Sequence, residues 1–411
     1  MNLLALAVPF FLVSLLVEIF VDWRRGTGYY RSNDAINSIS AGVLSTTTGY
    51  FSKFVEWLIW GLVLKNFAIF DMPLDWFDFS ARGILLWVIA AVAWDFCYYW
   101  QHRFGHEISV FWASHSVHHQ SEDYNLSTAL RQSSTSFFYS WIFYLPLFLV
   151  GFPIEVLITV GAANLLYQFW VHTQHIGRLG LLDRIMVTPS NHRVHHAQNE
   201  RYIDKNYGGI FVLWDRAFGT FAEEADEEPV VFGVRKPLSN WNPFWANIQV
   251  FDYLLFDARR TRLWRDKIGI WFHRTGWRPA DVEVLYPKRH TDLASFEKFD
   301  PQLTLARRRY VLGQFFVVIL SSMMIAEGYV TGGAQAVLTP CVLLWVQLYA
   351  LGLLNGGQTH AINVELVRLF VITPLGVLVL QLVGFISPLT TFGWAVLGAY
   401  IFGSFLWLRK S

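Results

Sequence analysis

Long apolar runs alternate with polar connections over most of this 411-residue chain. A helix needs about 20 apolar residues to cross the hydrocarbon layer of a membrane, and most of the runs approach that length. The pattern therefore predicts an all-α, polytopic membrane bundle of about nine spans, near residues 3–21, 42–64, 82–101, 136–151, 154–173, 310–328, 336–354, 367–386 and 390–408. Only a tight turn, Gly151-Phe152-Pro153, separates the fourth run from the fifth, so this pair is either two crossings or a re-entrant hairpin.

One long stretch, residues 177–309, breaks this pattern by alternating charged residues with tryptophans. Such a composition is typical of a segment that rests on a bilayer surface, because tryptophan and basic side chains favour the membrane–water interface. We therefore expect four regions: N-terminal transmembrane helices at 1–81, a histidine-rich domain at 82–225, a cytosolic amphipathic cap at 226–309 and a C-terminal transmembrane bundle at 310–411.

Histidine is concentrated in one part of the chain, since ten of its 13 copies lie between positions 102 and 196. Eight of them form three clusters, HX3H, HX2HH and HX2HH, and residues three or four apart share one helix face. Neutral imidazole binds transition metals, and this number exceeds the four protein ligands of a zinc site, which favours two ions with open positions. Nearly all-nitrogen ligation beside lipid favours oxygen activation by iron. The predicted ligands are His102, His106, His115, His118, His119, His172, His192, His195 and His196.

Two further polar residues share helix faces with these ligands. A polar stripe along the fifth run ends in His172 and His175, and such a stripe faces the interior of a bundle. We expect His175 to be a ligand, a group that supports a ligand or an interfacial residue. Asp95 lies within about 40° of His102 and His106 on one helix face, so we expect it to accept the free ring N–H of a ligating histidine. The alternative for Asp95 is a helix-end carboxylate that reaches water.

The distribution of basic residues predicts the orientation. Arginines follow the first run, precede the sixth and end the chain, whereas the connections on the opposite side are mainly acidic. Because basic loops stay in the cytoplasm, we expect an integral multi-pass protein with its N-terminus outside and its histidine clusters on the cytoplasmic side. The net charge of +1 argues against a nucleic-acid partner. The two cysteines, Cys97 and Cys341, lie in separate apolar runs, which predicts no disulfide.

The strings around the histidine clusters resemble a known family. They are HRFGHEISVFWASHSVHHQSEDYNLSTALRQ at 102–132 and NHRVHHAQNERYIDKNYGGIFVLWDRAFGTF at 191–221. Both closely resemble the alkylglycerol (glyceryl-ether) monooxygenases, a branch of the fatty acid hydroxylase/sterol desaturase superfamily. The resemblance implies that residues 82–225 form a non-haem di-iron (two Fe) catalytic domain. It implies O2, a tetrahydrobiopterin reductant and a membrane ether lipid, hydroxylated to give an aldehyde and a glycerol derivative. It also implies that Glu107 is needed for activity.

Other functions stay open. A sterol or fatty-acyl hydroxylase or desaturase of the same superfamily would need a separate donor of the cytochrome b5 type, because no fused haem domain is visible. A metal transporter with a histidine-rich sensor would place its ligands at mid-span and on a loop. A bis-histidine haem needs only two axial ligands and leaves HX2HH unexplained.

Overall fold

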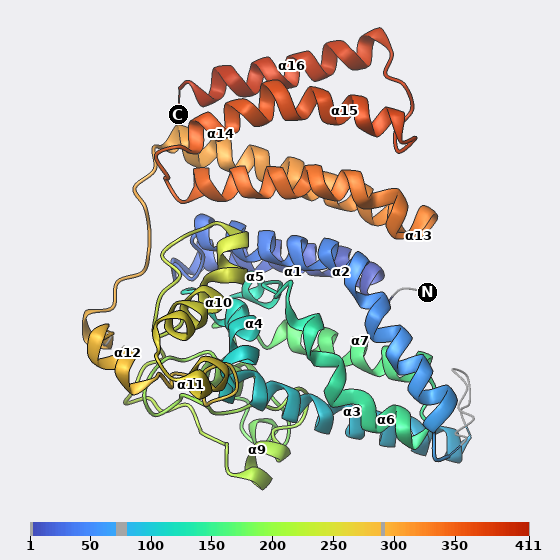
Figure 1. Ribbon diagram of the computed structural model, residues 1–411, viewed down its shortest axis with the longest axis vertical. Helices are drawn as coiled ribbons and strands as arrows, with labels where there is room; N and C mark the ends of the chain where they lie inside the picture. The colour runs from blue at the N-terminus through green and yellow to red at the C-terminus, as the bar shows by residue number, and fades with distance from the viewer. Residues whose placement is uncertain (1–2, 71–79, 289–291, 411) are drawn as a thin grey trace. The chain divides into compact units, whose positions relative to one another are not determined.

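The computed structural model describes residues 3–70, 80–288 and 292–410 (Figure 1). These residues form helices and turns with three isolated β-bridges and no strand, which confirms the predicted all-α class for the part of the chain described. The chain divides into two compact units. The first unit comprises Met1–Arg31, Ser52–Pro237 and Asn247–Glu297, and the second comprises Ser32–Phe51, Leu238–Ala246 and Lys298–Ser411.

The first unit holds the histidine clusters. Its α-helices are α1 (Leu3–Arg25), α3 (Ala81–Glu107), α4 (Ser109–His119), α5 (Leu126–Ala129), α6 (Leu145–Val150), α7 (Ile154–Trp170), α8 (Pro189–His195), α9 (Leu213–Phe218), α11 (Trp264–Gly269) and α12 (Ala280–Leu285). Short 3-10 helices lie at Ser136–Phe138, Ser140–Tyr144, Leu182–Arg184 and Leu293–Ser295. Two helices, α2 (Ser32–Phe67) and α10 (Pro243–Arg260), belong partly to each unit. The second unit adds α13 (Leu305–Asn355), α14 (Ala361–Val367), a π-helix (Arg368–Ile372), α15 (Thr373–Leu382) and α16 (Thr391–Leu408).

Helix α3 is the central element of the first unit and packs against α4 and α7 (Figure 1). It begins after Ser80, whose hydroxyl accepts the backbone N–H of Gly83 at 3.1 Å and so caps the helix. Its apolar face packs through Trp94, whose ring stacks on Tyr144 with centroids 4.0 Å apart. The α7 backbone approaches the same ring at Gly161, where a Cβ would lie 2.5 Å from Trp94. Glycine is therefore required there for α3 and α7 to pack this closely.

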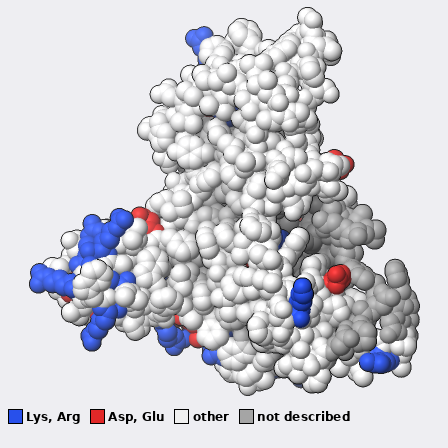
Figure 2. All heavy atoms as spheres, turned by 45° about the vertical axis from the view of Figure 1, so that its right-hand side comes forward, with Lys and Arg blue, Asp and Glu red and all other residues white. Residues whose placement is uncertain are grey.

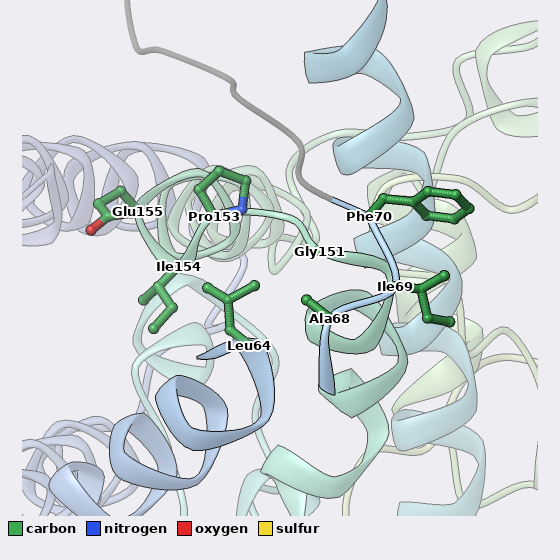
Figure 3. Close-up of a pocket in the computed structure, with 8 residues that line it drawn as sticks. All are labelled: Leu64, Ala68, Ile69, Phe70, Gly151, Pro153, Ile154 and Glu155. Carbon is green, nitrogen blue, oxygen red and sulfur yellow. The ribbon is translucent and has the colours of Figure 1, made fainter. Parts of the chain in front are cut away.

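The tight turn predicted at residues 151–153 is present. Gly151 ends α6 in the left-handed conformation, with φ +110°, and α7 begins directly after Pro153. A Cβ on Gly151 would collide with the Phe70 carbonyl, because the chain after α2 pairs with the end of α6 through Ile69 N–H and the Leu149 carbonyl at 2.8 Å. These segments line an open hollow of about 440 Å³ (Figure 3). It contains no histidine and is separate from the predicted ligands.

The prediction of one continuous helix over residues 136–151 is wrong. The segment forms two 3-10 turns followed by the short helix α6. Pro146 explains the break, because its ring nitrogen has no hydrogen to donate and it is tolerated only in the first turn of a helix. Whether α6 and α7 cross the membrane or form a hairpin stays a prediction.

Four described helical segments are long and apolar enough to span a membrane: Ala81–Glu107, Leu305–Asn355, Ala361–Leu382 and Thr391–Leu408. Much of the visible surface carries no charge (Figure 2). The second of these segments covers the two runs predicted at 310–328 and 336–354, and its helical conformation is interrupted at Gly333, where φ is 71°. The nine crossings therefore stay a prediction. The four long apolar segments agree with the expectation of an integral membrane protein.

Candidate metal centre

The structure brings all nine predicted ligands into two groups. The first group is His102, His106, His115, His119 and His195, and the second is His118, His172, His192 and His196. Within each group the candidate ligand nitrogens all lie within 4.8 Å of one another. Both groups consist of histidine alone, so among the described residues neither contains a carboxylate or thiolate.

The two HX2HH motifs each supply both groups, in a reciprocal way. On α4, His115 and His119 are four residues apart and share one face, which serves the first group, while His118 is rotated by about 100° and serves the second. In the second motif the roles are exchanged: His192 and His196 serve the second group and His195 the first. Each motif therefore divides its histidines between the two groups, which explains why neighbouring histidines occur in it.

The junction of α3 and α4 directs their histidines at each other. Helix α3 ends at Glu107 because Ile108 is extended, with φ −114° and ψ 126°, and α4 starts one residue later. The chain turns back there, and His106 Nε2 lies 3.2 Å from His119 Nε2.

Backbone carbonyls fix the ring orientation in the second group. His118 Nδ1–H donates to the Arg131 carbonyl at 2.9 Å and His172 Nδ1–H donates to the Gln168 carbonyl at 2.7 Å. Because a carbonyl can only accept, the proton of each neutral ring is on Nδ1 and a lone pair is on Nε2. The two Nε2 atoms face each other at 3.2 Å. Two lone pairs at this distance repel unless a cation lies between them.

The nitrogen spacing fits ligands around a metal ion. Metal–imidazole bonds of about 2.0–2.1 Å place neighbouring ligand nitrogens about 2.8–3.4 Å apart in octahedral or tetrahedral geometry. The Nε2 atoms of His192 and His172 are 3.0 Å apart, and those of His196 and His192 are 3.2 Å apart. In the first group His119 Nε2 lies 3.1 Å from His115 Nε2. The donor set and its spacing therefore fit a bound transition metal.

In the first group, buried ring nitrogens without a hydrogen-bond partner also indicate a metal site. His102 Nδ1–H donates to the Tyr207 carbonyl at 2.9 Å, and His195 Nδ1–H donates to the Lys205 carbonyl at 3.0 Å. Their Nε2 atoms are buried and have no hydrogen-bond partner among the described residues. A buried nitrogen without a partner is costly, and a metal ion would satisfy both.

Burial keeps these rings in the ligating form. It lowers the pKa of His118 to about 4, and it lowers the pKa values of His195 and His196 well below their usual range, with neighbouring histidines adding to the effect. A protonated imidazole has no lone pair for a metal, so a depressed pKa favours metal binding at neutral pH.

His175 and Glu107 lie outside both groups. His175 Nε2 is 3.9 Å from the Asp22 carboxylate, and its ring packs on Tyr29 with centroids 5.1 Å apart. Glu107 forms an ion pair with Arg103 one helical turn earlier, at 2.9 Å. Among the interpretations predicted for His175, the structure favours a supporting or interfacial residue.

The predicted hydrogen bond from a histidine to Asp95 is not formed. Asp95 lies seven residues before His102, so it shares the helix face but sits about 10 Å lower along the axis. Its carboxylate instead accepts two backbone N–H groups, from Ile210 at 2.7 Å and Phe211 at 3.1 Å. It also accepts the Trp214 indole N–H and the Asn164 amide, both at 2.9 Å.

Asp95 therefore fixes one end of the loop formed by residues 207–211, which orients His102. A second carboxylate, Asp215, fixes the other end of the same loop. Asp215 accepts the N–H groups of Tyr207 at 2.7 Å and Gly208 at 2.8 Å. Gly209 lies so close to Asp95 that a Cβ there would be 2.7 Å from a carboxylate oxygen. The loop carries the Tyr207 carbonyl, so both carboxylates act on the His102 ring through the backbone.

A third buried carboxylate, Glu18 of α1, supports the second group. It accepts hydrogen bonds from the Thr173 hydroxyl, which follows His172 in the chain, and from Leu126 N–H at 2.8 Å. Neither Asp215 nor Glu18 was predicted from the sequence. Glu18 carried a signal, because it is an acidic residue within the apolar run 3–21, which is costly in a membrane protein and is usually functional. Asp215 lies in the polar stretch 177–309 and carried no such signal.

Comparisons with known proteins agree with this site. The fatty acid hydroxylase family model matches residues 87–220, which contain all nine ligands. Alkylglycerol monooxygenase of Danio rerio is 36% identical over 392 residues, covering 93% of this chain and 83% of the relative. The Homo sapiens enzyme of the same name is 42% identical over 280 residues, covering 67% of this chain and 60% of the relative. The Xenopus tropicalis enzyme is 33% identical over 369 residues, with 88% and 79% covered.

No solved structure matches the chain with significance. The relatives nevertheless extend well beyond the histidine-rich segment, and they confirm the resemblance found in the sequence strings. The chain therefore belongs to the alkylglycerol monooxygenase family, and with its four long apolar segments it is an integral membrane monooxygenase.

Proposed function

We propose that this monooxygenase binds two iron ions and hydroxylates the ether-linked carbon of an alkylglycerol, with O2 as oxidant and tetrahydrobiopterin as reductant. Hydroxylation at that carbon gives a hemiacetal, which separates into an aldehyde and a glycerol derivative. The substrate follows from the names of the relatives, which are alkylglycerol monooxygenases over most of this chain. A separate electron donor and a sterol or fatty-acyl substrate are the alternative.

One observation carries the two-metal proposal. The histidines form two adjacent groups, and in the second group the Nε2 lone pairs of His118 and His172 face each other at 3.2 Å without a proton to bridge them, because Nδ1 of each ring donates to a backbone carbonyl. This arrangement is unfavourable for an apoprotein and favourable around cations. Iron at these positions would supply the activation of O2 for attack on a C–H bond.

The chain's own residues orient the ligands and exclude water. Carbonyl groups hold His102, His118, His172 and His195 at Nδ1, so each ring presents Nε2 to the centre. Aromatic rings give each group an apolar wall. Trp112 lies 5.1 Å from His106, and Tyr124 lies 5.2 Å from His196, measured between ring centroids. Exclusion of water protects a reactive oxidising centre from side reactions.

The proposed topology has nine crossings, with the N-terminus outside and the histidine groups on the cytoplasmic side. Its support is the distribution of arginines, which flank alternate apolar runs. This orientation would give the metal groups access to a reductant made in the cytosol.

The test is a product assay with the purified, iron-loaded full chain in lipid nanodiscs. We expect an alkylglycerol, O2 and tetrahydrobiopterin to yield a fatty aldehyde detectable by mass spectrometry, and the corresponding acylglycerol ester to yield none. His118→Ala should abolish the product, whereas His273→Ala should not, because His273 is exposed and stacks on Trp277 outside both groups. Turnover of a sterol or fatty acid with a cytochrome b5-type donor, and none of the ether lipid, would contradict the proposal.

A further inference from the structure

A basic edge lies beside the metal centre, at residues 259–274. It contains six basic residues, Arg259, Arg260, Arg262, Arg265, Lys267 and Arg274, and one acidic residue, Asp266. Figure 2 shows Lys and Arg side chains gathered at one margin of the molecule, with few Asp or Glu among them. The side chains of Arg265 and Arg274 are 83% and 75% accessible, and each lies near one carboxylate, Asp266 at 3.4 Å and Asp204 at 3.9 Å. The edge therefore presents a strong positive potential to its surroundings.

Large apolar side chains project from the same edge. Trp264 is 76% exposed, Ile268 is 62% exposed and Phe272 is 67% exposed. Trp264 and Ile268 are four residues apart on α11 and so share one face. Exposed tryptophan, isoleucine and phenylalanine among arginines form the amphipathic pattern of a segment lying in the headgroup region of a bilayer.

The position of the edge relative to α3 supports this location. The Thr275 N–H donates to the carbonyl of Glu107, the last residue of α3, at 3.0 Å. At the start of α4, which follows α3 directly, Ser109 N–H donates to the His273 carbonyl at 3.0 Å and Val110 N–H donates to the Trp271 carbonyl at 2.9 Å. Because α3 is long and apolar enough to span a membrane, the edge lies level with the end of that span, where the bilayer surface is expected.

We propose that the basic edge docks on anionic phospholipid headgroups of the bilayer that contains the chain. The guanidinium groups would pair with lipid phosphates and carboxylates, while Trp264, Ile268 and Phe272 enter the boundary between headgroups and acyl chains. Each basic residue near an anionic surface favours the docked state by about fivefold. The docked edge would keep the α3–α4 junction, which carries His106, at the membrane surface. This inference is independent of the lipid substrate proposed above.

The test places a fluorophore at the edge. The two native cysteines are buried, so Ile268→Cys can be labelled selectively in the full chain with an environment-sensitive dye. The labelled protein is placed in nanodiscs of phosphatidylcholine alone or of phosphatidylcholine mixed with phosphatidylserine. We expect a blue-shifted emission and protection from aqueous iodide in the mixed discs, with much less protection in neutral discs or at high salt.

Charge variants supply the control. In the labelled chain, the triple variant Arg259→Gln, Arg262→Gln, Arg265→Gln should lower the docked-to-free ratio in mixed discs by about 100-fold, from about fivefold per charge. Arg201→Gln, which removes an exposed arginine outside the edge, should have no effect. Unchanged iron content in the triple variant shows that it folds.

Three results would overturn the proposal. They are equal iodide access in neutral and anionic discs, protection that survives the triple variant, and protection in detergent that appears only as protein concentration rises. The last would identify the edge as a contact between two copies of the chain.

Discussion

Replacement of Asp95 by asparagine is expected to weaken the first histidine group and to spare the second. The carboxylate binds the loop whose Tyr207 carbonyl orients His102, and its hydrogen bonds within the described part of the chain include none to the second group. Asparagine has nearly the same shape, so it leaves no cavity. The effect of the substitution is therefore confined to hydrogen bonds.

The magnitude follows from the four donors that surround Asp95. Each carboxylate oxygen accepts two hydrogen bonds. Asparagine keeps one accepting oxygen, and its NH2 group faces the other two donors. Two hydrogen bonds to a charged group are lost, one from a loop N–H and one from Asn164 or Trp214, each worth about 1.5–3 kcal/mol, so the loop itself is destabilised by about 1.5–3 kcal/mol. Loss of outer support for a metal ligand typically costs about 10–100-fold in metal affinity or activity.

The assay is metal analysis combined with a double-variant comparison. Asp95→Asn should lower occupancy of the first group, and adding it to His106→Ala should remove little further metal, because both changes act on the same group. Added to His118→Ala, it should leave the chain nearly free of metal. Asp226→Asn, which alters an exposed carboxylate 86% accessible, is the matched control. Full metal content and activity in Asp95→Asn, or equal loss from both groups, would refute this account of the loop.

Three other predictions concern Glu107, Glu18 and the membrane topology. Glu107→Gln should reduce activity by about 10–100-fold yet retain metal, because Glu107 pairs with Arg103 and lies outside both groups; metal loss as complete as in His106→Ala would make Glu107 a ligand. Glu18→Gln should weaken the second group and spare the first in the same double-variant assay, since Glu18 binds the Thr173 hydroxyl beside His172. A C-terminal tag should be cytoplasmic and a tag inserted at residues 71–79, which lie outside the described residues, should be on the opposite side; protease protection in the reverse sense would contradict the topology.

The parts of the fold that sequence could predict are those with a local cause. Apolar length predicted α3 and α16, and Gly151 with Pro153 predicted the turn between α6 and α7. The error at 136–151 arose because hydropathy alone does not detect that Pro146 cannot continue a helix.

In the candidate site, too, the features with a local cause could be predicted from the sequence and the others could not. Histidine spacing predicted eight of the nine members of the two groups, because spacing on a helix fixes the face of each ring, and the polar stripe along the fifth apolar run predicted His172. It did not predict how each HX2HH motif is shared between two groups, which depends on the angle between α4 and α8. The supporting groups were also missed, because the carbonyls of Tyr207, Lys205 and Arg131 leave no mark in the sequence. Asp95 was predicted on the correct face of α3, but it lies too far along the helix axis to contact His102. Helical periodicity gives the direction of a side chain around the axis and does not show which residues touch.

The measurement that tests the central claim most directly is the metal content of the full chain, purified without oxygen and loaded with iron. Two groups of five and four histidines predict about two iron ions per chain. His106→Ala and His118→Ala, one from each group, should each lose about one ion, while His273→Ala should keep both. A single tightly bound ion, or none, would contradict the two-metal centre.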